Sequence, residues 1–341
     1  MAKTEKLLER LEALRVETGV ARTIFAVCPN SLSVIRASFR AAKRNNAPIY
    51  FAATLNQIDG DGGYTGMVQS QFTKMLQLEA DRVNYTGCSI VAIDHGGPWL
   101  KDKQRVEKWS TEDAMNGVKK SFEDAVLAGY DLIHVDPTVD INVAKGDVID
   151  IHVVVRRTVE LIKHIEDFRV ANNLPEISYE VGTEEVHGGL ADETTFDTFL
   201  TELKSGLAEV GLAHVWPCFI VGKVGTDLDT AIFDPEVARN LTAKVRPHGS
   251  WIKGHYTDGV SNPEEYPLSG MGAANVGPEF TISEYEALKE LDALERRFEA
   301  EGKVAVLSNM AATLERLVYE SGRWIKWLHE DEAGKDFPEL T

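Results

Sequence analysis

The stretch SIVAIDHGGPW (residues 89–99) begins like a buried strand and ends in a turn that carries an acid and a histidine. Its first five residues are small, β-branched and apolar, which predicts a strand that is covered on both faces. Asp94 and His95 then stand side by side before a Gly-Gly-Pro turn. Such endings occur at active sites and at ordinary strand ends, so the rest of the chain has to decide between these interpretations.

Seven further apolar runs of strand length follow the same pattern, and helix-like stretches separate most of them. Strands that alternate with helices predict parallel βαβ units. Eight such units close a (β/α)8 TIM barrel, which is the predicted fold. An open doubly wound sheet is the alternative, but no GxGxxG follows the first strand. The predicted strands cover residues 22–27, 48–55, 89–94, 132–136, 177–182, 214–222, 250–255 and 273–278.

The length of 341 residues fits one barrel domain over residues 1–341. We predict the barrel itself at about residues 20–300, with a helix before it. Helical sequence continues beyond what the eighth unit needs, which predicts a C-terminal helical extension at about residues 301–330. We expect this extension to pack on the barrel or on a partner subunit.

The formal charge of −18, from 54 acidic and 36 basic residues, argues against nucleic-acid and acidic-membrane partners. A local Lys, Arg or metal can still attract an anionic small substrate within one pocket. The longest apolar runs have the length of strands, so no transmembrane helix is predicted. The N-terminal sequence is an amphipathic helix pattern without an apolar signal region, which makes the cytoplasm the expected location.

The residues that could take part in catalysis or binding lie at the ends of the predicted strands. A TIM barrel builds its active site at the C-terminal ends of its strands, and six of the eight predicted strands end in titratable groups. Each has an ordinary explanation alone, such as a helix-terminal charge for Glu184 or a turn cap for Asp136. Their shared location favours a functional cluster. The candidates are Asn56, Gln57, Tyr64, Asp94, His95, His134, Asp136, Glu184, His187, Lys223, His255, Thr257, Asp258 and Asn275.

Histidines and carboxylates from separate strands, all directed to one mouth, predict a divalent-metal site. Imidazole with carboxylate suits zinc, manganese or a similar ion, and open coordination positions leave room for substrate oxygens. Such a metal polarises a carbonyl or hydroxyl, while nearby carboxylates donate and accept protons. The sequence contains no GxSxG and no P-loop that would indicate another chemistry.

Six motifs in order resemble the family of the so-called non-catalytic subunit of class II tagatose-1,6-bisphosphate aldolase, once labelled tagatose-6-phosphate kinase. They are NQ…GGYTGM, DHGGP, IHVDPT, YEVGTE, HYTD and NVGPEFT, and they span about Asn56 to Thr281. The resemblance implies a TIM barrel related to the metal-dependent class II aldolases. Some members are described as accessory subunits, while others act as ketose epimerases at carbon 4 or on related sugar acids.

The resemblance also implies roles for single residues. DHGGP is similar to the aldolase strand that ends in the proton-transferring Asp and a zinc-binding His, which makes Asp94 the acid/base and His95 a ligand. His255 resembles the last zinc histidine of the aldolases. Asp136 and Glu184 fall where acidic catalytic residues are expected.

Two departures from the aldolase pattern change these expectations. Where aldolases place another zinc histidine after strand six, this chain reads VGKVGTD, so Glu184 is expected to complete the metal ligands. HYTDGVSNP replaces the glycine- and serine-rich phosphate loop after strand seven. Lys223 is the candidate for holding a phosphate or carboxylate end of the substrate. The substrate-binding candidates are Asn56, Gln57, Tyr64, His134, His187, Lys223, Thr257, Asp258 and Asn275.

Two functions remain open from the sequence. One is a metal-dependent enzyme acting on a ketose or ketose phosphate at the bond between carbons 3 and 4, by carbon 4 epimerisation of the fructose/tagatose type or by aldol cleavage. Proton or hydride transfer at carbon 4 is a further route. The other is an accessory subunit that stabilises a separate class II tagatose-1,6-bisphosphate aldolase, which the missing strand-six histidine favours. Gathered acidic and histidine side chains favour the enzyme, because buried charges cost free energy unless paired or metal-bound. The long terminal helices are compatible with a homo-oligomer.

Overall fold

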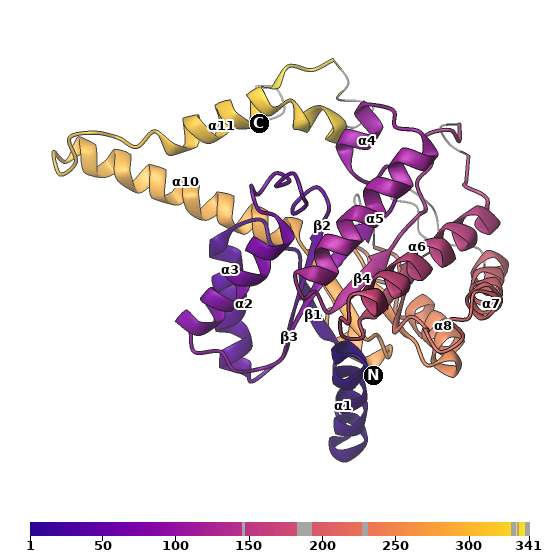
Figure 1. The fold of residues 1–341 in the computed structure, drawn as a ribbon. Coiled ribbons are helices and arrows are strands. Elements are labelled where there is room, and N and C mark those ends of the chain that lie inside the picture. The colour runs from indigo at the N-terminus through magenta and orange to yellow at the C-terminus, as the bar shows by residue number, and fades with distance from the viewer. Residues whose placement is uncertain (145–146, 183–192, 227–230, 329–331, 333, 338–341) are drawn as a thin grey trace. The chain divides into compact units, whose positions relative to one another are not determined.

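The computed structural model describes residues 1–144, 147–182, 193–226, 231–328, 332 and 334–337. Within them, eight parallel strands close into a barrel in the order β1-β2-β3-β4-β5-β6-β7-β8, and β8 pairs with β1 (Figure 1). The TIM barrel predicted from the alternation of strands and helices is therefore confirmed.

All eight predicted strands are present, most of them slightly shorter than expected. The largest difference is at the sixth strand, predicted over residues 214–222, where only three residues pair. Pro217 interrupts the apolar run there, and proline has no N–H to donate to a strand neighbour. The strands are β1 Ile24–Val27, β2 Ile49–Thr54, β3 Ser89–Gly96, β4 Leu132–Val135, β5 Ser178–Gly182, β6 Phe219–Val221, β7 Trp251–Gly254 and β8 Ala273–Val276.

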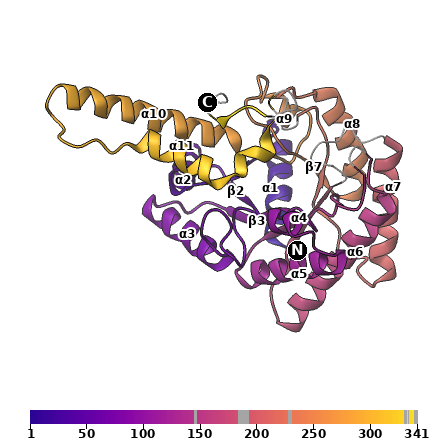
Figure 2. The same ribbon diagram turned by 90° about the horizontal axis from the view of Figure 1, so that it is seen from above.

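The helices that lie between successive strands in the chain surround the barrel (Figures 1 and 2). Several begin at a side chain that accepts a backbone N–H of the first turn, namely Ser31, Ser110, Asp150 and Asp234. The helices are α1 Lys3–Thr18, α2 Leu32–Asn45, α3 Gln69–Arg82, α4 Asp102–Val106, α5 Thr111–Leu127, α6 Ile151–Ala171, α7 Glu193–Glu209, α8 Pro235–Val245, α9 Glu265–Leu268, α10 Pro278–Ala300 and α11 Met310–Ser321, with short 3-10 turns at Arg246–His248 and Arg323–Trp327.

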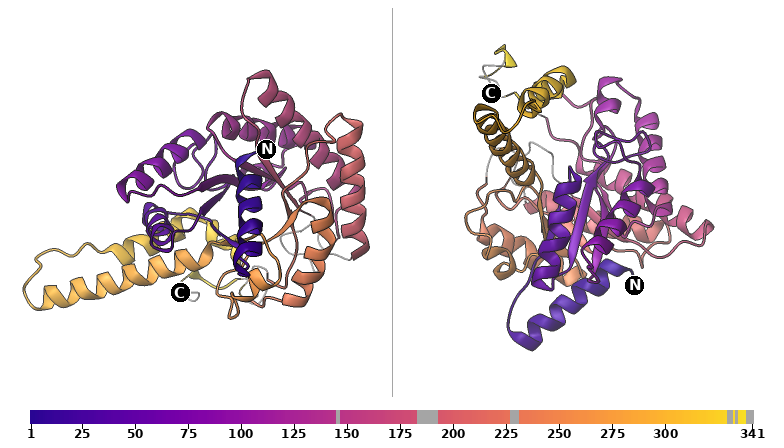
Figure 3. Two further views of the ribbon diagram at one scale, coloured as in Figure 1. Left: turned by 90° about the horizontal axis from the view of Figure 1, so that it is seen from below. Right: turned by 90° about the vertical axis from the view of Figure 1, so that its left-hand side faces the viewer.

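The N-terminal end of the barrel is apolar and is covered by α1, which crosses it in the view from below (Figure 3). Leu8 and Leu11 of this helix pack into a buried cluster with strand residues such as Ile24 and Phe219. The polar residues of the barrel interior gather toward the opposite end. Helix α1 therefore covers the N-terminal end of the barrel, and the polar residues that could carry out chemistry lie at the C-terminal end.

The chain forms two compact units, Met1–Glu279 and Phe280–Thr341. The first contains all eight strands of the barrel, the last of which ends at Val276. The predicted barrel of about residues 20–300 includes the helix after that strand, and its boundary stays a prediction. The second contains most of α10 and all of α11; within it the Ser308 hydroxyl donates to Glu295 at 2.7 Å. The single-domain organisation stays a prediction. In the part of the chain that the structure describes, no helix combines the length and apolarity needed to span a membrane.

Gly97 follows β3 and lies against the backbone of Asp136 at the end of β4, which gives a testable prediction. A Cβ atom at this position would lie 1.7 Å from the backbone oxygen of Asp136, an overlap that only a backbone shift can relieve. We expect Gly97→Ala to lower the free energy of unfolding by about 3 kcal/mol. Gly60→Ala is the control, because its Cβ would meet only Asp124 Oδ2 at 3.6 Å. Urea unfolding that gave both variants equal stability would contradict this packing.

Candidate functional site

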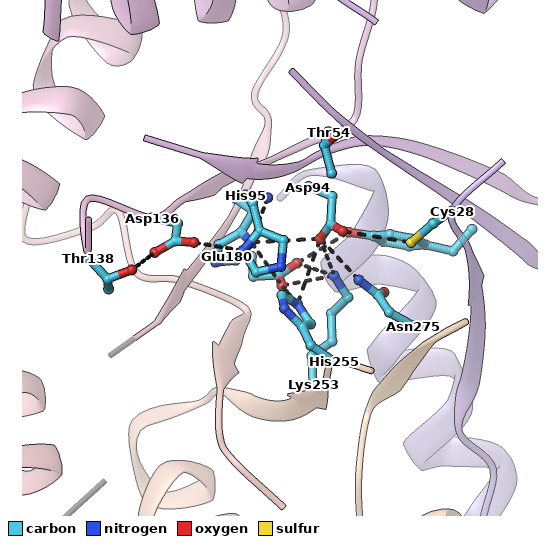
Figure 4. A network of polar contacts seen from close by, with 12 residues as sticks. Cys28, Thr54, Asp94, His95, Asp136, Thr138, Glu180, Lys253, His255 and Asn275 are labelled. Carbon is cyan, nitrogen blue, oxygen red and sulfur yellow. Dashed lines mark hydrogen bonds and ion pairs between the residues drawn. The ribbon is translucent and has the colours of Figure 1, made fainter. Parts of the chain in front are cut away.

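A cluster of buried and partly buried polar side chains fills the C-terminal mouth of the barrel (Figure 4). Its members come from β3, β4, β5, β7 and β8 or from the residue just after a strand. They are linked by hydrogen bonds and ion pairs into one network. The cluster consists of Asp94, His95, His134, Asp136, Glu180, Lys253, His255 and Asn275.

Asp94 and His95 both join this cluster although neighbouring strand residues normally point to opposite faces. The pairing of β3 with β4 is irregular between Ile93 and Gly96, and His95 adopts a φ of +48°. This left-handed conformation is unusual for a residue with a side chain and typically costs about 1 kcal/mol or more. The local irregularity explains how two consecutive residues can serve one site.

Three imidazoles stand together in the cluster. The ring centres of His95 and His255 lie 4.5 Å apart, and each lies 5.1 Å from that of His134. Each ring offers a nitrogen within 4.8 Å of the nitrogens of the other two. His95 Nδ1 is held by Asp136 Oδ2 at 2.7 Å. A carboxylate behind a histidine is the arrangement that orients metal-ligating imidazoles.

A second, overlapping group could also hold an ion. Asp94, His134, Glu180 and His255 have ligand atoms within 4.8 Å of one another. Glu180 Oε1 lies 2.9 Å from His255 Nε2 and 3.5 Å from His134 Nδ1. His134 and His255 belong to both groups, so the site offers either three imidazoles or two imidazoles with two carboxylates.

The charges and burial in the cluster give His95 and His255 different pKa values. Burial alone would lower the pKa of His95, but the carboxylates of Asp94 and Asp136 raise this pKa to about 9. Burial lowers the pKa of His255 to about 4, against the attraction of Asp94. At neutral pH His255 is therefore a neutral imidazole able to bind a metal, whereas His95 has to release a proton to do so.

The carboxylates of the cluster are ionised at neutral pH. Burial favours their neutral forms, but positive neighbours outweigh it. His95, His255 and Lys253 keep the pKa of Asp94 well below its usual value. Lys253 above all lowers the pKa of Glu180 to about 2. A buried carboxylate that keeps its charge next to imidazoles suits proton transfer or metal binding.

The donor set fits a divalent transition metal. His134 Nδ1 accepts the backbone N–H of His95 at 3.1 Å, so its lone pair is used in this structure, and Nδ1 would bind a metal only by giving up this hydrogen bond. His134 Nε2 and His255 Nδ1 are buried, and neither has a hydrogen-bond partner among the residues that the structure describes. Unpaired buried polar atoms are costly in a native fold unless a ligand completes them. Imidazole nitrogens with nearby carboxylates are the ligands that zinc and manganese accept.

The raised pKa of His95 predicts a pH effect on stability of the metal-free chain. A histidine with a folded pKa near 9 and an unfolded pKa near 6.5 contributes stability that is complete below pH 6.5 and is lost as the pH rises through 9. We expect this loss to be on the order of 3 kcal/mol. The free energy of unfolding would be measured in the presence of a chelator below pH 6.5 and above pH 9, for the wild type and for His95→Asn. If the variant lost as much stability between these pH values as the wild type, the effect would not come from His95.

The structure brings many of the predicted site residues together. Asn275 Nδ2 donates to Asp94 Oδ1 at 3.0 Å, and the hydroxyl of Thr257 donates to the backbone oxygen of Asn275. Thr257 therefore supports the wall of the cluster from behind. The predicted residues found in the cluster are Asp94, His95, His134, Asp136, His255 and Asn275.

Other predicted residues make contacts that hold loops. Asn56 Nδ2 donates to the backbone oxygen of Leu100 at 3.0 Å, and Gln57 Nε2 donates to that of Pro29 at 2.8 Å. Tyr64 belongs to the same loop and exposes 51% of its surface. These contacts order the rim of the barrel. A role for these three residues in substrate binding stays a prediction.

Asp258 and Lys223 also lie outside the hydrogen-bonded cluster. Asp258 Oδ1 accepts the backbone N–H groups of Gly277 and Glu279, at the start of α10. Lys223 follows β6 and is partly buried. Glu184 and His187, which were expected as metal ligand and substrate contact, lie outside the described residues.

The sequence prediction missed Glu180 and Lys253, which form a fully buried ion pair inside the barrel. Lys253 Nζ lies 2.8 and 2.7 Å from the two oxygens of Glu180. Both residues sit within strands rather than at their ends. A signal was present, because Lys253 is two residues before His255 and thus faces the same side of the strand.

Comparison with known proteins agrees with this geometry. The chain matches the model of the D-tagatose-1,6-bisphosphate aldolase subunit GatZ/KbaZ-like family over residues 9–338. A probable tagatose 6 phosphate kinase from Sinorhizobium meliloti 1021 has 23% identity and a TM-score of 0.76, covering 94% of this chain and 80% of that one.

Two aldolase structures share the fold at lower similarity. The YdjI aldolase from Escherichia coli K12 has 15% identity and a TM-score of 0.53, over 85% of this chain and 86% of that one. A fructose-bisphosphate aldolase from Campylobacter jejuni has 13% identity and a TM-score of 0.57, over 86% and 81%. The resemblance inferred from the sequence motifs is confirmed: the chain belongs to the D-tagatose-1,6-bisphosphate aldolase subunit GatZ/KbaZ-like family.

Proposed function

We propose that the chain is a metal-dependent enzyme that breaks the bond between carbons 3 and 4 of a ketose or ketose phosphate. The observation that carries this proposal is the group of three imidazoles next to the ionised, buried carboxylate of Asp94. A scaffold has no need of such a group, because unpaired buried polar atoms lower stability. Membership of an aldolase-related family supports the same chemistry.

His95, His134 and His255 would hold the ion, with zinc or manganese as the expected metal. When bound, it supplies a Lewis acid for the carbonyl and hydroxyl oxygens of an open-chain ketose. Glu184 was expected to complete the ligands in place of the histidine missing after strand six. His134 from β4 could provide that third nitrogen from within the cluster if its Nδ1 exchanged the backbone N–H of His95 for the ion.

Asp94 would act as the general base. Its carboxylate accepts the proton of the carbon 4 hydroxyl while the bond between carbons 3 and 4 breaks and the bonding electrons move toward the carbon 2 carbonyl. Asn275 holds one oxygen of Asp94, which fixes the direction of the other. Asn275 Oδ1 is buried without a partner in the described part of the chain, and it can accept a substrate hydroxyl.

The fate of the two fragments decides the reaction. Rotation of the aldehyde fragment and bond formation on its other face give the carbon 4 epimer, whereas release of both fragments gives aldol cleavage. Asp136 is bound to His95 and accepts the Thr138 hydroxyl at 2.5 Å, which suits orientation of His95. Glu184 stays the candidate for a second proton-transfer group.

An accessory subunit is the second candidate function. It is favoured by the description of the family as an aldolase subunit and by the absence of a histidine after β6. In this case the chain would stabilise a separate catalytic aldolase and turn over nothing itself.

Product analysis separates the two functions. The purified chain alone would be incubated with fructose, tagatose and their phosphates in the presence of manganese or zinc. A carbon 4 epimer or a triose product supports the enzyme and names its reaction. Lack of any product, together with activation of a partner aldolase by the added chain, supports the accessory subunit.

A further inference from the structure

Lys253 is the most unusual residue of the barrel interior. It lies within β7 and is fully buried, with 0% of its surface exposed. Its ammonium contacts both oxygens of Glu180, at 2.8 and 2.7 Å, and lies 3.7 Å from Asp94 Oδ1. It also stands over the ring of Tyr50 at 5.1 Å. Figure 4 shows it directed into the group of side chains that would surround a metal.

This pairing restricts what Glu180 can do. Each of its oxygens accepts a hydrogen bond from the Lys253 ammonium, and Oε1 is additionally 2.9 Å from His255 Nε2. To bind a metal, Glu180 would have to weaken its hydrogen bonds to Lys253, and the buried ammonium would then rely on Asp94 Oδ1, which lies 3.7 Å away. The four-residue ligand group that includes Glu180 is therefore disfavoured relative to the three imidazoles.

The net charge of the site points in the same direction. The carboxylates of Asp94, Asp136 and Glu180 with the ammonium of Lys253 leave two negative charges, which one divalent ion balances when the imidazoles are neutral. Without Lys253 a third negative charge would remain next to the ion. A metal would then attract Glu180 as an additional ligand.

We propose that Lys253 is a positioning residue that keeps Glu180 out of the coordination shell of the metal. Three histidines would then hold the ion and leave room for oxygens of the ketose. This inference rests on the metal site of the proposed function, and it assigns a role to a residue pair that the reaction scheme does not use. Open positions are what distinguishes a catalytic metal site from a closed structural one.

Replacement of Lys253 should have opposite effects on metal binding and on turnover. Lys253→Met removes a positive charge beside the ion and frees Glu180 to coordinate it. We expect at least roughly tenfold tighter metal binding from these two changes. The freed carboxylate fills a position that substrate needs, so kcat should fall by about tenfold or more. A lysine that served only stability would not tighten metal binding.

The experiment measures the zinc Kd of the full chain by competition with a chromogenic chelator at constant pH. Lys101→Met is the matched control, because it removes the same charge from an ion pair with Asp59 and Asp61 outside the cluster. Its Kd should stay within about threefold of the wild-type value, since remote charges are screened. The visible spectrum of the cobalt-loaded chain provides a second readout, which should change on Lys253→Met as a ligand is added.

The double variant Glu180→Gln/Lys253→Met keeps the test decisive if Lys253→Met fails to fold. Replacing both partners removes the buried charges together and is tolerated far better than breaking the pair. If Glu180 is not a ligand, the zinc Kd of the double variant stays within about threefold of wild type; if it is, binding weakens by about tenfold or more.

The outcomes separate this inference from the proposed function. A wild-type chain that binds no metal would overturn both. Metal binding by the wild type, with weaker binding by Lys253→Met or a tenfold loss in the double variant, would overturn the role of Lys253 and leave the metal-dependent function standing.

Discussion

Asp94→Asn should lower kcat by about a thousandfold while the bound metal is retained. The substitution keeps the shape of the side chain, and an amide oxygen at position 94 can still accept the hydrogen bond from Asn275, which now measures 3.0 Å. The amide cannot accept the proton of the carbon 4 hydroxyl. Because the three imidazoles are unchanged, metal content should stay near that of the wild type.

The measurement is kcat and metal stoichiometry of the same preparations. Asp167→Asn is the matched control, because this exposed residue on α6 forms an ion pair with Lys163, four positions before it on the same helix, outside the cluster. It should leave both quantities unchanged. If the kcat of Asp94→Asn fell by less than about threefold, another residue would have to carry out the proton transfer.

Removal of a ligating histidine should have the second large effect. We expect His255→Ala, and separately His95→Ala, to weaken metal binding by about a hundredfold. Turnover should fall by a similar factor. His255 belongs to both possible ligand groups, and His95 is oriented by Asp136. The far-UV circular dichroism of each variant should match that of the wild type, since the strands that carry these residues are held by many other contacts.

His164→Ala provides the control, because this partly exposed histidine of α6 contacts Glu123 and lies outside the cluster. It should bind metal and turn over like the wild type. If the His95 and His255 variants kept their metal but lost the ability to stabilise a partner aldolase, the accessory subunit would be the better explanation.

The fold was predictable because its signal is repeated along the chain. Eight apolar runs separated by helical stretches leave few arrangements other than a parallel barrel. The length of β6 was harder to predict from the sequence. The apolar run around Pro217 resembles a strand, but the backbone cannot pair along the whole run.

The site was predictable only in part, for geometric reasons. Strand ends in a barrel converge, which was enough to place Asp94, His95 and His255 in one cluster. The grouping of His134 with the other two imidazoles depends on the register of β4 against β3, which the sequence does not specify. The positive φ of His95 that turns two neighbouring residues into one site has no sequence signal.

Glu180 and Lys253 were missed because attention to strand ends overlooks charges within strands. Buried lysines and glutamates are rare unless paired, so each one inside an apolar strand implies a partner on another strand. The motifs SYEVG and SWIKGH contain one acid and one base of this kind. Such pairs can be sought in other barrel sequences as indicators of a polar layer beneath the site.

Turnover measured against bound metal tests the proposed function most directly. The purified chain would be stripped with a chelator, loaded stepwise with manganese or zinc, and assayed with fructose, tagatose and their phosphates without any partner protein. We predict that formation of the carbon 4 epimer or of triose products rises linearly with occupancy and reaches its plateau at one ion per chain. Absence of turnover at full occupancy, or equal turnover in the stripped chain, would contradict a metal-dependent enzyme at this site.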